Sequence, residues 1–358
     1  MEVYKLFLDI LTPVHIGDGA EIEPYEYVID GQFYKINLSK FILNLSQEDQ
    51  NQFNRLLETD IISCREFVKN KFPGKDCVVY SSQVSEEIIS FYIGKIDDPR
   101  NQLLIYPFLR GNSHLPYIPG SSLKGALRTA LIFNLLEKDC LDKERGDILE
   151  ANLLKCERGW LDRDQGIFIT KGLDPQKDPF RCIKIGDVML PQDSTIIQRI
   201  ITVSKKNENI QPMNIQLIKE TTCSDFTSKP LCITTEIRYD DQLSKKNRDI
   251  KKKITIEEII DTNKIFSEKV INYELKKYFD NHPTSDVYKK LKDYWAGLKS
   301  NEFMFRLGWG SGYNSMTVNL KLSHPKLVKT RKLTNGLIPM GWVKGKIEKI
   351  EQKQEMSL

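Results

Sequence analysis

The segment from Pro116 to Ala130 constrains the fold most, because a turn rich in proline and glycine runs directly into an amphipathic helix. Apolar side chains recur there with helical spacing and predict one buried face: Leu123, Ala126, Leu127, Ala130 and Leu131. Ser121 or Ser122 is the expected N-cap, since a hydroxyl can accept a hydrogen bond from the first free amides. The segment should therefore pack one helix face against a core and leave the start of the helix at a turn.

The first two turns of this helix also predict an anion site. Lys124 and Arg128 lie four residues apart where the helix dipole disfavours cations unless an anion is near. Gly120 would let that anion approach the backbone amides, so a phosphate is expected at Gly120, Ser121, Ser122, Lys124 and Arg128. The alternative is a capped core helix with two solvated cations. Ala126 and Leu127 stand where a nucleotide P-loop has Lys and Ser or Thr, so nucleotide hydrolysis has little support.

Length and charge indicate two domains with different surroundings. A chain of 358 residues exceeds the size at which a single core usually stops growing. Residues 1–100 hold 10 Lys and Arg against 17 Asp and Glu, whereas the remainder holds 43 against 32. An acidic first part and a basic body fit a protein that presents one region to a polyanion and another to a protein neighbour. They fit a plain gradient of surface charge nearly as well.

Cysteine, histidine and hydropathy patterns exclude several protein classes. The seven cysteines form no C-x-x-C pair, and the four histidines have no metal-binding spacing, so neither a disulfide framework nor a metal site is expected. No cofactor motif is present. Glu2, Lys5 and Asp9 interrupt any signal-peptide core, and no run of about 18 apolar residues could span a membrane. The sequence predicts a soluble, cytoplasmic protein.

Strands and helices alternate irregularly, which predicts an α+β fold. Strands are expected at Tyr4–Ile10, 87–93, 103–109, 181–185, 195–203, 231–238, 303–307 and 316–322, with a hairpin turning at Asp30-Gly31. Helices are expected from Ser39 to Leu57 with an interruption, and at about 256–279 and 285–298. A domain boundary near residue 190 would divide the chain into 1–190 and 191–358.

Two further segments could bind a polyanion. The run at 245–253 has no apolar period and reads as an exposed arm, carrying Lys245, Lys246, Arg248, Lys251, Lys252 and Lys253. Such runs are usually only solvated, but a basic arm would add salt-dependent affinity for nucleic acid. A glycine loop between two expected strands could approach a phosphate backbone, with one indole for stacking: Gly308, Trp309, Gly310, Ser311 and Gly312. The alternative is a tight hairpin with Trp309 in the core.

Catalytic motifs are nearly absent. His15 and Asp18 are the one pair that could support acid–base cleavage of RNA, and they lie in a glycine loop with Gly17 and Gly19. A histidine beside Gly-Asp-Gly is more commonly part of a turn. We therefore expect no enzyme activity and keep this pair as a weak candidate.

Three glycine motifs together resemble the RAMP superfamily of CRISPR-associated proteins. They are Pro13-Val14-His15-Ile16-Gly17-Asp18-Gly19, the string IPGSSLKGALR at 118–128, and Gly308-Trp309-Gly310-Ser311-Gly312. Their order and spacing are most similar to the subunit that caps the crRNA 3′ end in type III-A Csm complexes. The resemblance implies two ferredoxin-like (RRM-like) domains with helical insertions. It also implies that the residues from Gly17 to Gly19, Gly120 to Arg128 and Gly308 to Gly312 contact or shape RNA.

The same resemblance implies partners and a role. The partners would be crRNA, complementary target RNA, the backbone RAMP subunit and the small helical subunit. The role would be non-catalytic, supporting crRNA 3′-end maturation by engaging host nucleases. The alternatives are a RAMP-type endoribonuclease working through His15 and Asp18, and a backbone RAMP subunit of a type III complex.

Overall fold

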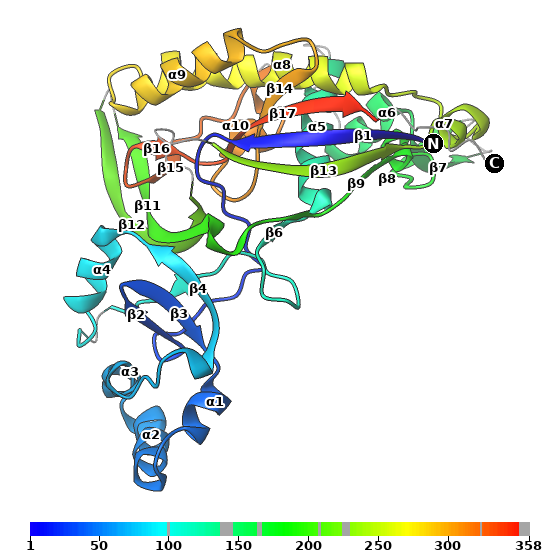
Figure 1. Ribbon diagram of the computed structural model, residues 1–358. Coiled ribbons are helices and arrows are strands. Elements are labelled where there is room, and N and C mark those ends of the chain that lie inside the picture. The colour runs from blue at the N-terminus through cyan, green and yellow to red at the C-terminus, as the bar shows by residue number, and fades with distance from the viewer. Residues whose placement is uncertain are drawn as a thin grey trace.

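The computed structural model describes residues 1–98, 101–136, 146–162, 167–206, 209–223, 230–322 and 324–350. Within them the chain forms two large, mostly antiparallel sheets, with two helices along one side and a helical lobe at the far end (Figure 1). The prediction of an α+β fold is confirmed. In this part of the chain no helix is long and apolar enough to cross a membrane.

Strand β1 lies at the centre of the first sheet. The strand order is β14 (Glu302–Arg306), β17 (Trp342–Lys349), β1 (Glu2–Ile10), β13 (Leu231–Tyr239) and β9 (Ile183–Ile185), with every pair antiparallel. Leu6, Leu8 and Ile10 alternate along β1 and are at most 1% exposed, so they face the main core. Helices α5 (Gly120–Leu135) and α8 (Ile256–Tyr273) pack on that core and on each other.

The second sheet is built around a long hairpin. Its strands are β16 (Ile338–Pro339), β15 (Thr330–Thr334), β11 (Thr195–Lys206), β4 (Val78–Val84), β3 (Gln32–Ile36), β2 (Tyr27–Asp30), β12 (Asn209–Thr222) and β5 (Ile105–Tyr106). The hairpin pairs β11 with β12, and β4 and β5 add to it in parallel. The predicted turn at Asp30-Gly31 is confirmed, and Gly31 takes a positive φ of 67°. Strand β12 was not expected from the sequence.

Residues 38–70 form a separate helical lobe. Its helices are α1 (Leu38–Leu43), α2 (Gln47–Thr59) and α3 (Ile61–Asn70), capped by Asn37, Ser46 and Asp60. The predicted single helix capped by Ser39 is wrong, because the Asn37 and Ser46 side chains each start a new helix. Phe41, Phe53 and other apolar residues close a small core of their own.

Two predicted strands are helical. The segment Glu86–Ile93 is helix α4, because the Ser85 hydroxyl accepts the Ile88 amide while Glu86 and Glu87 occupy the first turn. The segment 316–322 contains the end of α10 (Tyr313–Met316) and the 3-10 helix Asn319–Lys321. There the Asn319 amide group donates to Asn314 and to the carbonyl of Lys326, so side-chain bonds replace a ladder.

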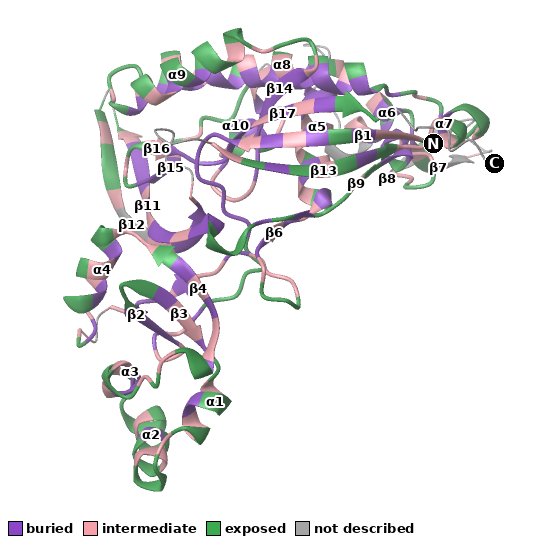
Figure 2. Ribbon diagram, viewed as in Figure 1, coloured by how far each residue is buried: buried purple, intermediate pink, exposed green. Residues whose placement is uncertain are grey.

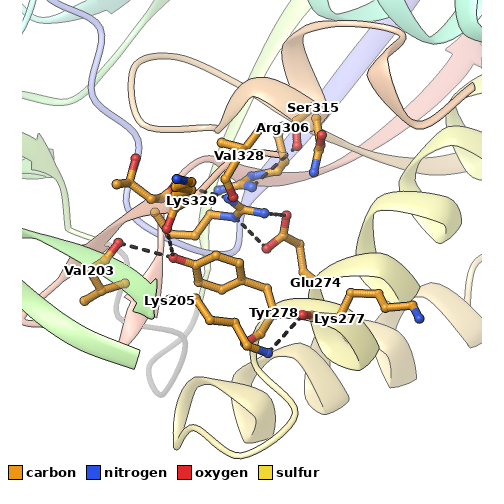
Figure 3. A network of polar contacts seen from close by, with 12 residues as sticks. Val203, Lys205, Glu274, Lys277, Tyr278, Arg306, Ser315, Val328 and Lys329 are labelled. Carbon is orange, nitrogen blue, oxygen red and sulfur yellow. Dashed lines mark hydrogen bonds and ion pairs between the residues drawn. The ribbon is translucent and has the colours of Figure 1, made fainter. Parts of the chain in front are cut away.

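The predicted pair of helices near the C-terminal end is confirmed. Helix α8 continues through a π-helical turn at Glu274–Tyr278, and α9 spans Thr284–Ala296. The inner face of α8 is buried and the outer face of α9 is exposed (Figure 2). The π turn places Glu274 against the guanidinium of Arg331, with two bonds of 2.7 and 2.8 Å in the interior (Figure 3). Tyr278 donates to the carbonyls of Lys329 and Val203, which ties this turn to the second sheet.

Smaller elements complete the described chain. They are α6 (Gly146–Leu154), α7 (Asp241–Lys246), β6 (Tyr117–Ile118), β7 (Glu157–Asp162), β8 (Ile167–Leu173), β10 (Val188–Met189) and the 3-10 helices Lys75–Cys77, Pro179–Cys182 and Gln192–Ser194. The expected strands at 103–109 and 181–185 shorten to β5 and β9. Both large sheets combine strands from before and after residue 190. The spans 1–190 and 191–358 therefore each contribute strands to both sheets.

Candidate nucleic-acid interface

The first backbone amide of helix α5 already has a hydrogen-bond partner within the protein. Pro119 is the N-cap residue, and the Gly120 amide donates to the Asp187 carboxylate at 2.8 Å. The predicted N-cap at Ser121 or Ser122 is therefore wrong. A Cβ on Gly120 would overlap the carbonyl of Ile185, so this glycine admits a neighbouring strand rather than a phosphate. The predicted apolar face is confirmed, since Leu123, Leu127, Ala130 and Leu131 are buried and Ala126 packs beside them.

The anion beside Arg128 is a pair of protein carboxylates. Arg128 bonds to Glu150 at 2.5 Å and to Asp178 at 2.7 Å. A cation near the start of this helix was expected to need an anion, and that anion is supplied by two side chains of the same protein. Lys124 is half-buried, and burial lowers its pKa while the Asp178 charge opposes that shift. Arg128 is thus placed as a structural residue.

The loop after β1 is anchored on three sides. The Val14 carbonyl accepts the Thr222 amide, the His15 carbonyl accepts the Trp309 amide, and the Ile16 carbonyl accepts the Leu109 amide. The last two of these bonds are 2.8 and 2.7 Å long. The predicted glycine motif is therefore held by β12, by the 308–312 loop and by the segment before β6.

His15 and Asp18 have separate hydrogen-bond partners, and burial outweighs the Asp18 charge, which favours the charged form of His15. His15 is 3% exposed, and its Nδ1 lies 2.7 Å from the Glu220 carbonyl. Burial lowers the pKa of His15 to about 4, so the ring is neutral at pH 7. Asp18 accepts a bond from the Ala20 amide at 2.9 Å and closes a turn. The geometry favours the turn interpretation over an acid–base pair.

The loop from Gly308 to Gly312 joins β14 to helix α10, not to a second strand. Gly308, Gly310 and Gly312 all have positive φ, from 78° to 83°. A Cβ on Gly308 would overlap the His15 carbonyl, so this glycine is required where the two loops touch. Trp309 is half-buried, and the indole meets the His15 ring edge to face at 6.0 Å. Trp309 is therefore neither a core residue nor a fully exposed one.

All three glycine motifs meet at one groove of about 390 Å³. The motif residues that line it are Gly17, Ser122, Gly125, Ala126, Gly308, Trp309 and Ser311, and Thr129 and Met316 extend it. The other predicted contacts, Gly19, Gly120, Ser121, Lys124, Arg128, Gly310 and Gly312, do not line this groove. Three segments distant in sequence thus form one concave surface, in which glycine, alanine and serine residues lie beside Ile16, Leu307 and the Trp309 indole.

Arg306 also lines the groove and was missed by sequence reasoning. Its guanidinium donates to the Met340 carbonyl at 2.6 Å and reaches the Gly310 carbonyl and the Ser315 hydroxyl at 3.4 Å. Figure 3 shows Arg306 beside Ser315. Burial lowers the pKa of Arg306, and the Glu274 charge opposes that shift. Arg306 therefore holds the glycine loop in place and sets a positive charge beneath the groove. Only its position at the end of a strand before Gly308 could have drawn attention to it.

The basic run is more ordered than expected. Lys245 and Lys246 end helix α7, Lys245 pairs with Asp241, and Lys252 pairs with Glu258. The run is largely exposed, as predicted, but Ile250 within it is 1% exposed and anchors it to the body. Five of the six cations are exposed, and Lys252 is half-buried: the exposed ones are Lys245, Lys246, Arg248, Lys251 and Lys253. Helix α7 lies near both ends of the described chain, well away from α10 (Figure 1).

Trp342 in β17 is completely buried and belongs to the core, unlike the half-buried Trp309. No group of His, Cys, Asp and Glu that could hold a metal occurs among the residues described.

Comparisons with known proteins relate the whole chain to one family. A model of the RAMP superfamily matches residues 7–315. A protein named CRISPR system Cms protein Csm5 from Methanocaldococcus jannaschii is 27% identical over 326 residues, which span 87% of this chain and 71% of that protein. Its namesake from Enterococcus italicus is 32% identical over 157 residues, 36% of this chain and 43% of that protein.

Solved structures share the fold. A chain in the cryo-EM structure of a Csm-crRNA-target RNA ternary complex of a type III-A CRISPR-Cas system has a TM-score of 0.67 at 21% identity, covering 96% of this chain and 100% of that one. The crystal structure of T. onnurineus Csm5 has a TM-score of 0.66 at 21% identity, covering 94% and 99%.

Proposed function

The chain belongs to the RAMP superfamily, and from that premise we propose that it is a non-catalytic RNA-binding subunit of a type III-A Csm effector complex. In that complex it caps the 3′ end of the crRNA and supports crRNA maturation and target binding. The names of the relatives and the solved ternary complex support this assignment. Two RRM-like domains with helical insertions are part of the proposal, with the boundary near residue 190 still a prediction.

The observation that carries the proposal is the convergence of three glycine motifs on one groove. Small residues let a sugar-phosphate backbone approach the main chain, and Trp309 offers a face on which a base can stack. Arg306 supplies positive potential from below. These are the properties of a sequence-tolerant RNA site, and none of them performs bond cleavage.

The proposed partners follow from the same assignment. They are crRNA, complementary target RNA, the backbone RAMP subunit and the small helical subunit, with host nucleases recruited for 3′-end trimming. The acidic residues 1–100, which include the helical lobe, suit a protein neighbour better than RNA. The exposed Lys245, Lys246, Arg248, Lys251 and Lys253 and the half-buried Lys252 remain proposed RNA contacts, outside the groove.

Two alternatives give different outcomes. An endoribonuclease would need a titrating His15, whereas this ring is buried, neutral and bonded to the Glu220 carbonyl. Cleavage of RNA by the purified chain, lost on changing His15, would support that alternative. A backbone subunit would occur in several copies along the guide, whereas one copy at the 3′ end supports capping.

The groove can be tested at Gly125, which lines it and has open space where a Cβ would stand. Gly125→Glu adds a carboxylate at the groove from a position where a Cβ meets no neighbour, and Gly125→Ala is the matched control. We expect the glutamate variant to weaken binding of single-stranded RNA about tenfold, because a like charge then faces the phosphates, while the alanine variant binds normally. Equal affinities for both variants in a filter-binding assay would contradict the proposal.

A further inference from the structure

Lys219 is a buried cation beside Trp309, which lines the groove. It lies on β12, is 5% exposed, and its ammonium stands 3.9 Å from the Tyr106 ring centroid and 4.2 Å from that of Trp309. Its Nζ is 3.5 Å from His15 Nε2. Because Nδ1 of His15 faces the Glu220 carbonyl, Nε2 serves as the acceptor, and one of the three ammonium protons is satisfied.

No carboxylate in the described chain forms an ion pair with Lys219. Its neighbour Glu220 is fully buried and is already bonded to Arg110, to the Thr195 hydroxyl at 2.7 Å and to the Phe108 amide at 2.9 Å. Glu21 favours the charged form of Lys219 from the exposed loop, but it is not within ion-pair distance. A buried ammonium held mainly by two aromatic faces is incompletely compensated.

A second lysine shares the same indole. The Lys332 ammonium lies 5.6 Å from the Trp309 ring centroid and donates to the Thr202 hydroxyl at 2.5 Å. It too forms no ion pair with a described carboxylate. Burial and the Lys332 charge together lower the pKa of Lys219 to about 8, so the two cations oppose each other. Two like charges around one half-buried ring are the arrangement that a bound anion would stabilise.

We propose that Lys219 and Lys332 form a phosphate-binding site for the RNA backbone around Trp309. The site rests on the proposed function and deepens it, since Trp309 also lines the groove and joins the two surfaces. A nucleotide that stacks a base on the indole brings its phosphate within reach of both ammonium groups. Neither lysine belongs to the glycine motifs, and both come from the second sheet, through β12 and β15.

The test is the dependence of RNA affinity on salt concentration, measured with the full chain and single-stranded RNA of mixed sequence. Lys219→Met removes the charge but leaves an apolar side chain that suits the aromatic cage, and Lys332→Gln removes the more accessible charge. Each change should weaken binding and reduce the slope of log affinity against log salt by about 0.7, the contribution of one phosphate contact on a single strand. Lys290→Gln, an exposed lysine on α9, is the control and should leave the slope unchanged.

The outcomes separate this site from the proposed function. If the wild-type chain binds no RNA, the proposed function fails and the site fails with it. If the wild-type chain binds RNA and both variants keep its slope, the site alone is overturned, and an acidic side chain of a neighbouring protein becomes the expected anion. Should circular dichroism show that Lys219→Met is unfolded, Lys332→Gln decides: a reduced slope supports the site and an unchanged slope overturns it.

Discussion

His15 illustrates how single buried polar residues hold the groove together. Its carbonyl accepts the Trp309 amide, its ring nitrogen meets the Glu220 carbonyl, and its ring edge faces the indole. His15, a weak catalytic candidate in the sequence, thus connects the first and third glycine motifs through its backbone and its ring. Burial keeps the imidazole neutral, because the charged form would lose its hydration.

This neutrality predicts a dependence of stability on pH. The pKa of His15 falls from 6.5 to about 4 on folding, so between these pH values the unfolded chain binds a proton that the folded chain does not. The free energy of unfolding is therefore unaffected by this group above pH 6.5. It decreases by roughly 3 kcal/mol in total as the pH falls from 6.5 toward 4. In His15→Asn, whose amide can still donate to the Glu220 carbonyl, urea unfolding should show a weaker loss across this window. An identical loss in both proteins would contradict the role assigned to His15.

At the scale of elements, ion pairs and close approaches join the pieces around α5. Arg128 connects this helix to α6 through Glu150 and to the 3-10 helix at 179–182 through Asp178. Gly120 lets the helix start directly on the strand that contains Ile185. The helix is therefore fixed at its first turn and again two turns later.

Replacing Arg128 should consequently affect stability. Arg128→Ala leaves two partly buried carboxylates without their cation, and we expect a loss of about 1–3 kcal/mol in the free energy of unfolding. Lys124→Ala, on the same helix, removes no ion pair and should lower that free energy far less. Thermal unfolding of both variants measures the difference; equal melting temperatures would show that the Arg128 ion pairs contribute nothing.

Local chemistry explains which elements could be predicted from the sequence. The β2–β3 hairpin, α5, α8 and α9 carry strong turn signals or long apolar periods, and their places are confirmed. Strand β12 was missed because its final residues, Lys219 to Thr222, are all polar and all buried, so no alternation marks them. Helix α4 is hard to distinguish from a strand in the sequence because its apolar run is short, and the Ser85 cap is the local signal that marks it as a helix.

The candidate site was predictable only in part, for a related reason. Glycine motifs are visible in the sequence because their conformation is local, and members of all three line one groove. Arg306 lines the groove and Lys219 contacts its Trp309, and both are placed by pairing between distant segments, β14 with β17 and β12 with β5. The carboxylates that bond to Arg128 and to the Gly120 amide also lie in other segments, at Glu150, Asp178 and Asp187.

At the scale of the whole molecule, charge is spread over separate surfaces. The helical lobe at one end is nearly neutral, with four Lys and Arg against five Asp and Glu in residues 38–70, whereas the exposed cations of the basic run follow α7 near the termini, well away from α10 (Figure 1). A single RNA strand would need to run across the molecule to meet both the groove and these cations.

RNA length should therefore reveal the role of the basic run. A triple variant, Arg248→Gln, Lys251→Gln and Lys253→Gln, should reduce the salt slope by up to about 2 for RNA long enough to span from the groove to α7, since three phosphate contacts are lost. A short RNA that fills only the groove should give the wild-type slope. If the long RNA also gives an unchanged slope, the run is only a solvated surface.

The position of β1 has a consequence for how the protein is made. This first strand has β13 on one side and β17 on the other, and both emerge from the ribosome long after it. Until then, Leu6, Leu8 and Ile10 lack their native partner strands, and the main sheet cannot be completed before β17 is synthesised. Nascent chains should therefore stay open to chaperones until β17 has emerged, and a ribosome that stops before β17 should release a product destined for proteolysis.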